Sequence, residues 1–268
     1  MKNPQDMKQE VYLCEQKGTT FIVVDIEENI QQAIERDKDE NRSDFVKYLQ
    51  RNDPSGFNEF RARKLNPSKE KIKEPLGISF LGVEETDVEY LNSQIGHLNI
   101  NKINIRDSKL DMPLPEHITD NVKTFFCGGK VKGVIDLDLY KNLEEINILD
   151  WDTKIKFKND SKKNNIRKLV VWYHKPKEKT LKTLIELLYN LEILEINHTN
   201  IETLEGVENL RFLKGIEIQY GRNLRQIDYL NECKKLEKVF FNNCKKIEDI
   251  EKLHQREGLY IRKAALSG

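Results

Sequence analysis

Apolar residues recur along most of the chain as a triplet at relative positions 1, 4 and 6. The copies are Ile78-Leu81-Val83, Ile100-Ile103-Ile105, Val122-Phe125-Cys127, Leu143-Ile146-Ile148, Ile166-Leu169-Val171, Leu191-Leu194-Ile196, Leu213-Ile216-Ile218 and Leu236-Val239-Phe241. Their starts are spaced by 22, 22, 21, 23, 25, 22 and 23 residues, and the longest spacing implies a small insertion near residues 175–179. Such regular spacing predicts a repeat solenoid.

Each repeat also has a second apolar limb, whose residues lie three positions apart, as in Ile201, Leu204, Val207 and Leu210. This spacing predicts a short helix or 3₁₀ turn that packs back on the strand formed by the triplet. One repeat cannot bury both limbs alone, but stacked repeats form a continuous core under a curved parallel sheet.

The chain turns off the strand at the eighth residue after each start, which is usually small or polar. The residues there are Thr86, Ser108, Lys130, Trp151, His174, Thr199, Gly221 and Cys244. Lys130 and Trp151 fit a turn poorly, so the two middle repeats are expected to be irregular.

The copy Leu191-x-x-Leu194-x-Ile196-x-x-Thr199-x-Ile201-x-x-Leu204 resembles the leucine-rich-repeat family, and the resemblance covers residues 78–253. None of the eight copies has the asparagine that the family usually places at the turn. The resemblance implies an α/β leucine-rich-repeat solenoid of about eight repeats. The solenoid would occupy residues 78–268, including a C-terminal edge strand at residues 259–261. Such solenoids mostly bind proteins, although a fold does not fix a partner.

Residues 1–77 lack the repeat and are expected to form a small α/β cap that covers the first repeat. The expected elements are a hairpin of Val11–Cys14 and Thr20–Ile26, a helix within residues 27–48, a turn at Asn52–Gly56 and a connection over residues 64–75. The alternative is a separately functional domain.

The side chains that alternate with the triplet should point outward on the concave face of the sheet, at the second, fourth and sixth residues after each start. In the first copy this rule places Phe80 outward. In the middle of the array it gives an apolar patch of Phe126, Leu149, Val170, Trp172 and Ile193. Such a patch favours a binding site, and the alternative is that a loop or the N-terminal region covers it.

Glu195 and Glu217 should lie side by side on adjacent strands of the same face, and Phe240 follows on the next strand. Like charges at opposed positions repel, and a cation on a partner would relieve the repulsion. The alternative is that neighbouring lysines screen the two carboxylates within the chain.

Charge and composition argue against some classes of function. Lysine plus arginine and aspartate plus glutamate both number 45, so no net field favours nucleic acid or anionic lipid. Met1 to Asp6 lack the apolar core of a signal peptide, and no apolar run approaches bilayer length. These features predict a cytoplasmic protein that binds neither membrane nor nucleic acid.

No pattern of catalytic, cofactor or metal-binding residues emerges. The four cysteines, Cys14, Cys127, Cys233 and Cys244, form no Cys-x-x-Cys pair, and the five histidines have no metal-ligand spacing. Cys127-Gly128-Gly129-Lys130 lacks the spacing of a phosphate-binding loop and is expected to be a tight turn at a strand end. Paired carboxylates such as Glu195 and Glu217 could divide acid and base roles, but an open face does not exclude water for such chemistry.

The sequence therefore predicts a non-catalytic module that binds one protein through the concave face, with Phe126, Leu149, Val170, Trp172, Ile193, Glu195, Glu217 and Phe240 as contact residues. Frequent lysine, asparagine and isoleucine suit a low-GC bacterium, whose small solenoids resemble immunity proteins that neutralise a toxin. The alternatives are an adaptor that also binds through its N-terminal domain and, third, an enzyme.

Overall fold

A computed structural model of the chain describes residues 9–16, 19–26, 61–151, 154–161, 163–248, 250–253 and 257–264. The chain forms two compact units, residues 1–122 and residues 123–268. The boundary expected between residues 77 and 78 lies inside strand β4 (Leu76–Leu81), which pairs with a strand on each side. Residues before and after that boundary thus share one sheet in the first unit.

The first unit begins with the predicted hairpin. Its elements are β1 (Gln9–Gln16), β2 (Thr19–Ile26), β3 (Arg61–Lys64), β4, α3 (Val88–Ile95), β5 (Ile100–Arg106) and α4 (Glu116–Asn121). β1 pairs antiparallel with β2 and β3, whereas β2, β4 and β5 run parallel. Residues 65–75 form neither helix nor strand. The helix expected within residues 27–48 and the turn expected at residues 52–56 lie outside the described residues.

The first apolar copy has a different register from the predicted one. Leu76, Ile78 and Phe80 are the buried side chains of β4, and Ile78 lies opposite Ile103 of β5, after a register shift at Leu76. The prediction that Phe80 points outward is therefore wrong, and Leu81, expected in the core, is only half-buried. The strand alternates from Leu76 onward, so its buried positions fall at every second residue.

The second unit is a parallel sheet with one strand per repeat. The strands are β6 (Thr124–Gly128), β8 (Glu145–Ile148), β10 (Lys168–Trp172), β11 (Ile193–Thr199), β12 (Gly215–Gly221), β13 (Lys238–Asn242) and the predicted edge strand β14 (Tyr260–Ala264), in that order across the sheet. Every triplet residue predicted in this unit is buried. The apolar periodicity thus identified the core of these repeats correctly.

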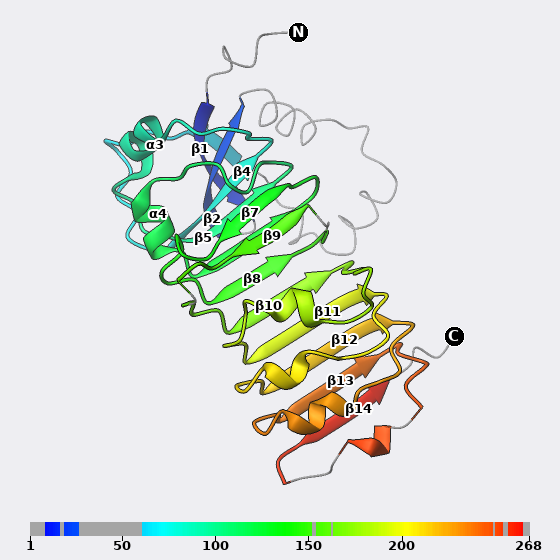
Figure 1. Cartoon of the computed structure of the whole chain (residues 1–268). Coiled ribbons are helices and arrows are strands. Elements are labelled where there is room, and N and C mark those ends of the chain that lie inside the picture. The colour runs from blue at the N-terminus through cyan, green and yellow to red at the C-terminus, as the bar shows by residue number, and fades with distance from the viewer. Residues whose placement is uncertain are drawn as a thin grey trace, which may run out of the picture. The chain divides into compact units, whose positions relative to one another are not determined.

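The return limbs differ between the middle and the last repeats. They contain β7 (Gly133–Asp136), β9 (Ile155–Lys158), α5 (Lys182–Ile185), η3 (Val207–Asn209), η4 (Asp228–Glu232) and η5 (Ile250–Lys252), on one side of the sheet (Figure 1). Short helices were predicted and are present in the last four limbs. The prediction is wrong for the two middle limbs, where β7 and β9 pair in parallel, because Val134, Ile135 and Ile155 are β-branched residues that favour strands.

Buried polar side chains at the turn position join successive repeats. The Thr199 hydroxyl donates a hydrogen bond of 2.7 Å to the carbonyl of His174, and the Cys244 thiol donates one of 3.5 Å to the carbonyl of Ile218. Both bonds run from one repeat to a backbone carbonyl of the preceding repeat, so they tie neighbouring repeats together. With its parallel strands, buried triplets and short return limbs, the second unit is an α/β leucine-rich-repeat solenoid.

Candidate binding face

The side of the second unit's sheet that faces away from the return limbs carries three rows of side chains, and we call it the open face. The front row is Thr124, Glu145, Lys168, Ile193, Gly215, Lys238 and Tyr260, the middle row is Phe126, Asn147, Val170, Glu195, Glu217, Phe240 and Arg262, and the rear row includes Trp172, Asn197, Gln219, Asn242 and Ala264. Members of a row are register partners on adjacent strands. The alternation of each strand places them together while the triplets are buried.

The five residues of the predicted apolar patch lie on, or directly after, the adjacent strands β6, β8, β10 and β11. Phe126 and Val170 lie in the middle row, and Leu149 follows the end of β8 and lies beside Gly128, where an added Cβ would be 3.3 Å from its own. Trp172 is 37% exposed and Ile193 is 40% exposed, whereas the other three are half-buried. Tryptophan and isoleucine are therefore the side chains of the patch most available to a partner.

A charged group lies beside the apolar patch. The ammonium of Lys168 is 3.4 Å from a carboxylate oxygen of Glu145 and 3.3 Å from one of Glu195. Partial burial lowers the pKa of Lys168, but Glu195 and Glu145 outweigh this effect and hold the pKa above its usual value. One lysine therefore balances two carboxylates, and such half-exposed pairs contribute little to stability.

Glu195 and Glu217 are direct register partners on β11 and β12, as predicted. The side-chain amide of Gln219 donates a hydrogen bond of 2.6 Å to the Glu217 carboxylate. Across the next strand pair Phe240 lies opposite Glu217, and the guanidinium of Arg262 lies 5.4 Å from the centre of the Phe240 ring. The structure thus brings all eight predicted contact residues onto one face.

An aromatic stack at the ends of the strands was not predicted. Tyr173 stacks on His198 with ring centroids 5.1 Å apart, and His198 stacks on Tyr220 at 4.3 Å, with the rings nearly parallel in both pairs. We call these three residues the ring stack. Trp172 contacts Tyr173 edge-on at 6.4 Å, so the ring stack adjoins the apolar patch.

The ring stack rests on an unusual backbone. The φ angles of Tyr173, His198 and Tyr220 are 61°, 56° and 54°, in the left-handed region that side chains larger than glycine rarely adopt. The sequence does contain a signal, because each residue is the seventh after its repeat start. Tyr260 of β14, which is 57% exposed, is a further aromatic residue of the open face that was expected only as part of an edge strand.

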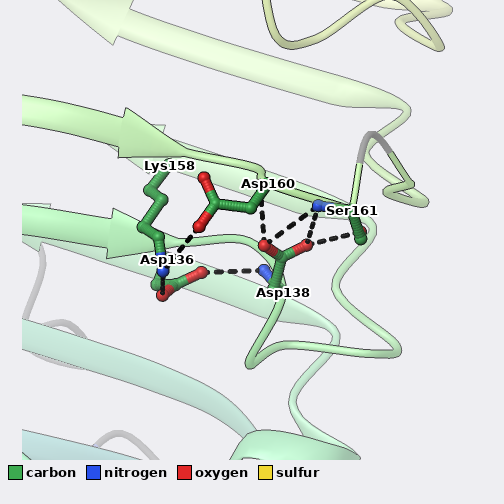
Figure 2. Close-up of polar contacts among 5 residues, drawn as sticks. All are labelled: Asp136, Asp138, Lys158, Asp160 and Ser161. Carbon is green, nitrogen blue, oxygen red and sulfur yellow. Dashed lines mark hydrogen bonds and ion pairs between the residues drawn. The ribbon is translucent and has the colours of Figure 1, made fainter.

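A second polar cluster lies on the return limbs (Figure 2) and has a structural role. The Asp138 carboxylate accepts hydrogen bonds from the backbone N–H of Asp160, at 2.7 Å, and from Ser161, while Lys158 forms 3.0 Å ion pairs with Asp136 and Asp160. The Ser161 hydroxyl is the main cause of the lowered pKa of Asp138. These contacts join successive return limbs. The carboxylates of Asp136, Asp138 and Asp160 are therefore already bonded within the fold.

The other candidate chemical groups are engaged in folding. β6 ends at Gly128, and the N–H of Gly129 (φ 74°) donates to Asp150 at 3.3 Å, as expected for a strand-end turn. Burial raises the pKa values of the Cys14 and Cys127 thiols to about 12 and of Cys244 to about 11. Among the described residues, no group of three or more histidine, cysteine or acidic side chains could hold a metal ion.

Within the same residues, no helix is long and apolar enough to cross a bilayer. No family model and no curated protein matches the sequence. Six chains among the solved structures match. One is the leucine-rich repeat domain of the type III effector XopL, with 13% identity and a TM-score of 0.45, where the match covers 70% of this chain and 76% of that domain.

Proposed function

We propose that the chain is a non-catalytic protein-binding module whose partner docks on the open face. The observation that carries this proposal is the exposure of Trp172 and Ile193 on the same face as the half-buried Phe126, Leu149 and Val170. Contiguous apolar surface rimmed by polar groups is typical of protein contact sites, and tryptophan is among the residues that contribute most to binding energy. Glu195, Glu217 and Phe240 extend the contact beyond the apolar patch.

The surroundings of Trp172 favour tight binding. Its indole packs edge-on against Tyr173, which is in turn held by His198. A side chain that is already ordered loses less conformational entropy when a partner covers it. The left-handed backbone of the ring stack adds to this argument, because strained residues often gather at functional sites.

A narrower proposal is that the partner is a toxin and that the chain acts as an immunity protein in the cytoplasm of a bacterium. Its support is the resemblance to bacterial solenoids of that kind and the carboxylate pair of Glu195 and Glu217, which suits a basic protein surface. The general proposal of a protein-binding face does not depend on this narrower one.

The experiment is capture of proteins from a lysate of the source cell by the whole chain and by two variants, Trp172→Ala and Ile193→Ala. Leu139→Ala is the matched control, because Leu139 is 56% exposed but lies on a return limb. We expect a captured protein to be retained by wild type and control and weakened at least about tenfold by Trp172→Ala. Circular dichroism establishes that all four chains are folded.

Retention of the same proteins by both face variants would contradict the proposal. In that case the contact lies on another surface, and the first unit, residues 1–122, becomes the next region to test.

A further inference from the structure

Three cations lie at the strand ends near the ring stack, each at the ninth residue after its repeat start. They are Lys175, Arg222 and Lys245, which follow β10, β12 and β13, and we call them the basic column. All three are exposed, whereas the turn residues directly before them are buried. The repeat of β11 has the neutral Asn200 at this position. The ninth position of these four repeats therefore contains no carboxylate.

The repeat holds these cations close together. The ammonium of Lys246 donates a hydrogen bond of 2.9 Å to the side-chain carbonyl of Asn223, so the segments that follow β12 and β13 lie side by side. Adjacent strands are about 5 Å apart, so the backbones of Lys175 and Arg222, two strands apart, are separated by roughly 10 Å. The Lys175 ammonium lies 5.8 Å from the centre of the Tyr173 ring. The basic column thus adjoins the ring stack, which in turn adjoins the apolar patch.

The charges of these strand ends do not balance. The segments that follow the last four triplets carry six lysines or arginines and only three glutamates, over residues 173–178, 198–203, 220–225 and 243–248. Within the described part of the chain, no member of the basic column lies within 4.0 Å of a carboxylate oxygen. At the strand starts, in contrast, Glu192 pairs with both Arg167 and Lys214. An excess of three positive charges therefore remains at the strand ends.

The neighbouring open face has no such excess. Its front and middle rows have three carboxylates and three cations, namely Glu145, Glu195, Glu217, Lys168, Lys238 and Arg262. The side chains named in its rear row, which include Trp172, are uncharged. A partner that covers Trp172 therefore meets a surface without net charge, bordered at the strand ends by a basic rim.

From this arrangement we infer that the partner presents an acidic segment to the basic column while it covers Trp172. Aspartate or glutamate carboxylates of that segment pair with Lys175, Arg222 and Lys245. Charged groups at the rim of a protein interface steer association and select the partner. The inference rests on the proposed function, because it identifies what the partner presents beside the open face. It does not depend on the narrower proposal of a toxin.

The same features favour a protein over a nucleic acid. Binding of nucleic acid rests on the neutralisation of many phosphates, whereas the excess here is three charges beside a face without net charge. Single strands also stack their bases on free aromatic faces. In the ring stack both faces of His198 are already covered, by Tyr173 and Tyr220. A short acidic segment of a protein needs only the exposed cations.

The test uses a phage library of random dodecapeptides selected on the whole chain. The best binder is synthesised as selected and with each aspartate and glutamate replaced by asparagine and glutamine. Dissociation constants are measured by calorimetry on wild type, on Trp172→Ala and on a column variant that combines Lys175→Gln, Arg222→Gln and Lys245→Gln. The matched control combines Lys69→Gln, Lys71→Gln and Lys73→Gln, at exposed lysines of the first unit. A single-stranded DNA dodecamer is titrated into the same proteins, and circular dichroism checks that each is folded.

We expect the selected peptides to be enriched in aspartate and glutamate. The column variant should bind the acidic peptide about tenfold more weakly than wild type, because each exposed ion pair contributes roughly a factor of two. It should also bind the acidic and neutral peptides alike. Added sodium chloride should weaken the acidic peptide more on wild type than on the column variant. The control should match wild type, and the DNA should bind more weakly than the acidic peptide.

Other outcomes overturn the inference. Peptides without an excess of acidic residues, or an equal loss on the control, would show that the basic column is not selective. DNA that binds more tightly than the acidic peptide and is lost on the column variant would assign the column to phosphate instead. If only Trp172→Ala weakens binding, the proposed function stands and the acidic contact is wrong. If only the column variant does, the acidic contact stands and the anchor at Trp172 is wrong. If neither variant weakens binding, or wild type selects no peptide, both fail.

Discussion

The imidazole of His174 lies edge-on to the indole of Trp151, with ring centroids 5.4 Å apart and an angle of 83° between the rings. His174 is 3% exposed, and neither of its ring nitrogens has a hydrogen-bond partner among the described residues. It occupies the turn position at which the next repeat has Thr199. Burial lowers the pKa of His174 to about 4, although Glu178 favours the charged form. The folded protein therefore keeps this imidazole neutral in weak acid.

This histidine should make the fold sensitive to acid. The unfolded chain takes up the proton below about pH 6.5, whereas the folded chain does so only near pH 4, so falling pH favours unfolding over that window. The cost at pH 4 is about 3 kcal/mol. In urea unfolding from pH 7 to pH 4, His174→Thr should lose correspondingly less stability than wild type. An identical pH dependence of the two chains would contradict this account.

Neighbouring residues on opposite faces of β11 should respond differently to truncation. Leu194 is completely buried, and Leu194→Ala should reduce the free energy of unfolding by about 2–5 kcal/mol. Ile193→Ala, on the open face, should cost less than about 1 kcal/mol because its side chain is already partly hydrated. Urea denaturation of both variants measures the difference. Similar losses of stability in the two variants would mean that the buried and open faces of β11 are assigned wrongly.

The Thr199 hydroxyl should stabilise the junction between two repeats. Thr199→Val keeps the side-chain shape but leaves the carbonyl of His174 without its 2.7 Å hydrogen bond, at a cost of about 1–3 kcal/mol. Thr183→Val, at an exposed position, is the control and should change stability by less than about 0.5 kcal/mol. Thermal unfolding followed by calorimetry distinguishes them, and equal midpoints would show that the hydroxyl is dispensable.

The cysteine thiols should be inert in the folded protein. All four are buried, and burial raises the pKa values of three of them, so little reactive thiolate forms at neutral pH. Ellman's reagent should label no thiol in native protein and four in urea. Rapid labelling of the native chain would mean that at least one cysteine is exposed.

The core of the second unit could be predicted because the fixed spacing of the apolar triplet leaves only one choice of which strand residues point into the core. The same reasoning misplaced the first copy, where Leu76, Ile78 and Phe80 compete with a triplet that begins at Ile78. Only pairing with β5, which places Ile78 opposite Ile103, decides between the two registers. When both registers would place apolar residues in the core, the sequence pattern alone does not decide between them.

The open face followed from the same alternation, but the ring stack did not. Tyr173, His198 and Tyr220 each come seven residues after the start of their repeat, yet aromatic residues are disfavoured at positive φ. The backbone preference of these aromatic residues therefore argued against the left-handed conformation that the repeat imposes on them. The open space above Gly215, where an added Cβ would meet no atom within 4 Å, was also not predicted, because a glycine in a strand does not indicate whether neighbouring side chains fill the space above it.

The alternation of each strand keeps the residues of the core and the residues of the open face at separate positions. A substitution in the front or middle row changes the surface offered to a partner, while the triplet beneath it continues to support the repeat. Under the proposed function, a protein built in this way can follow a changing target through single exposed substitutions, with little loss of stability at each step. The bare position at Gly215 shows how far this freedom extends, since even the presence of a side chain there is optional for the fold.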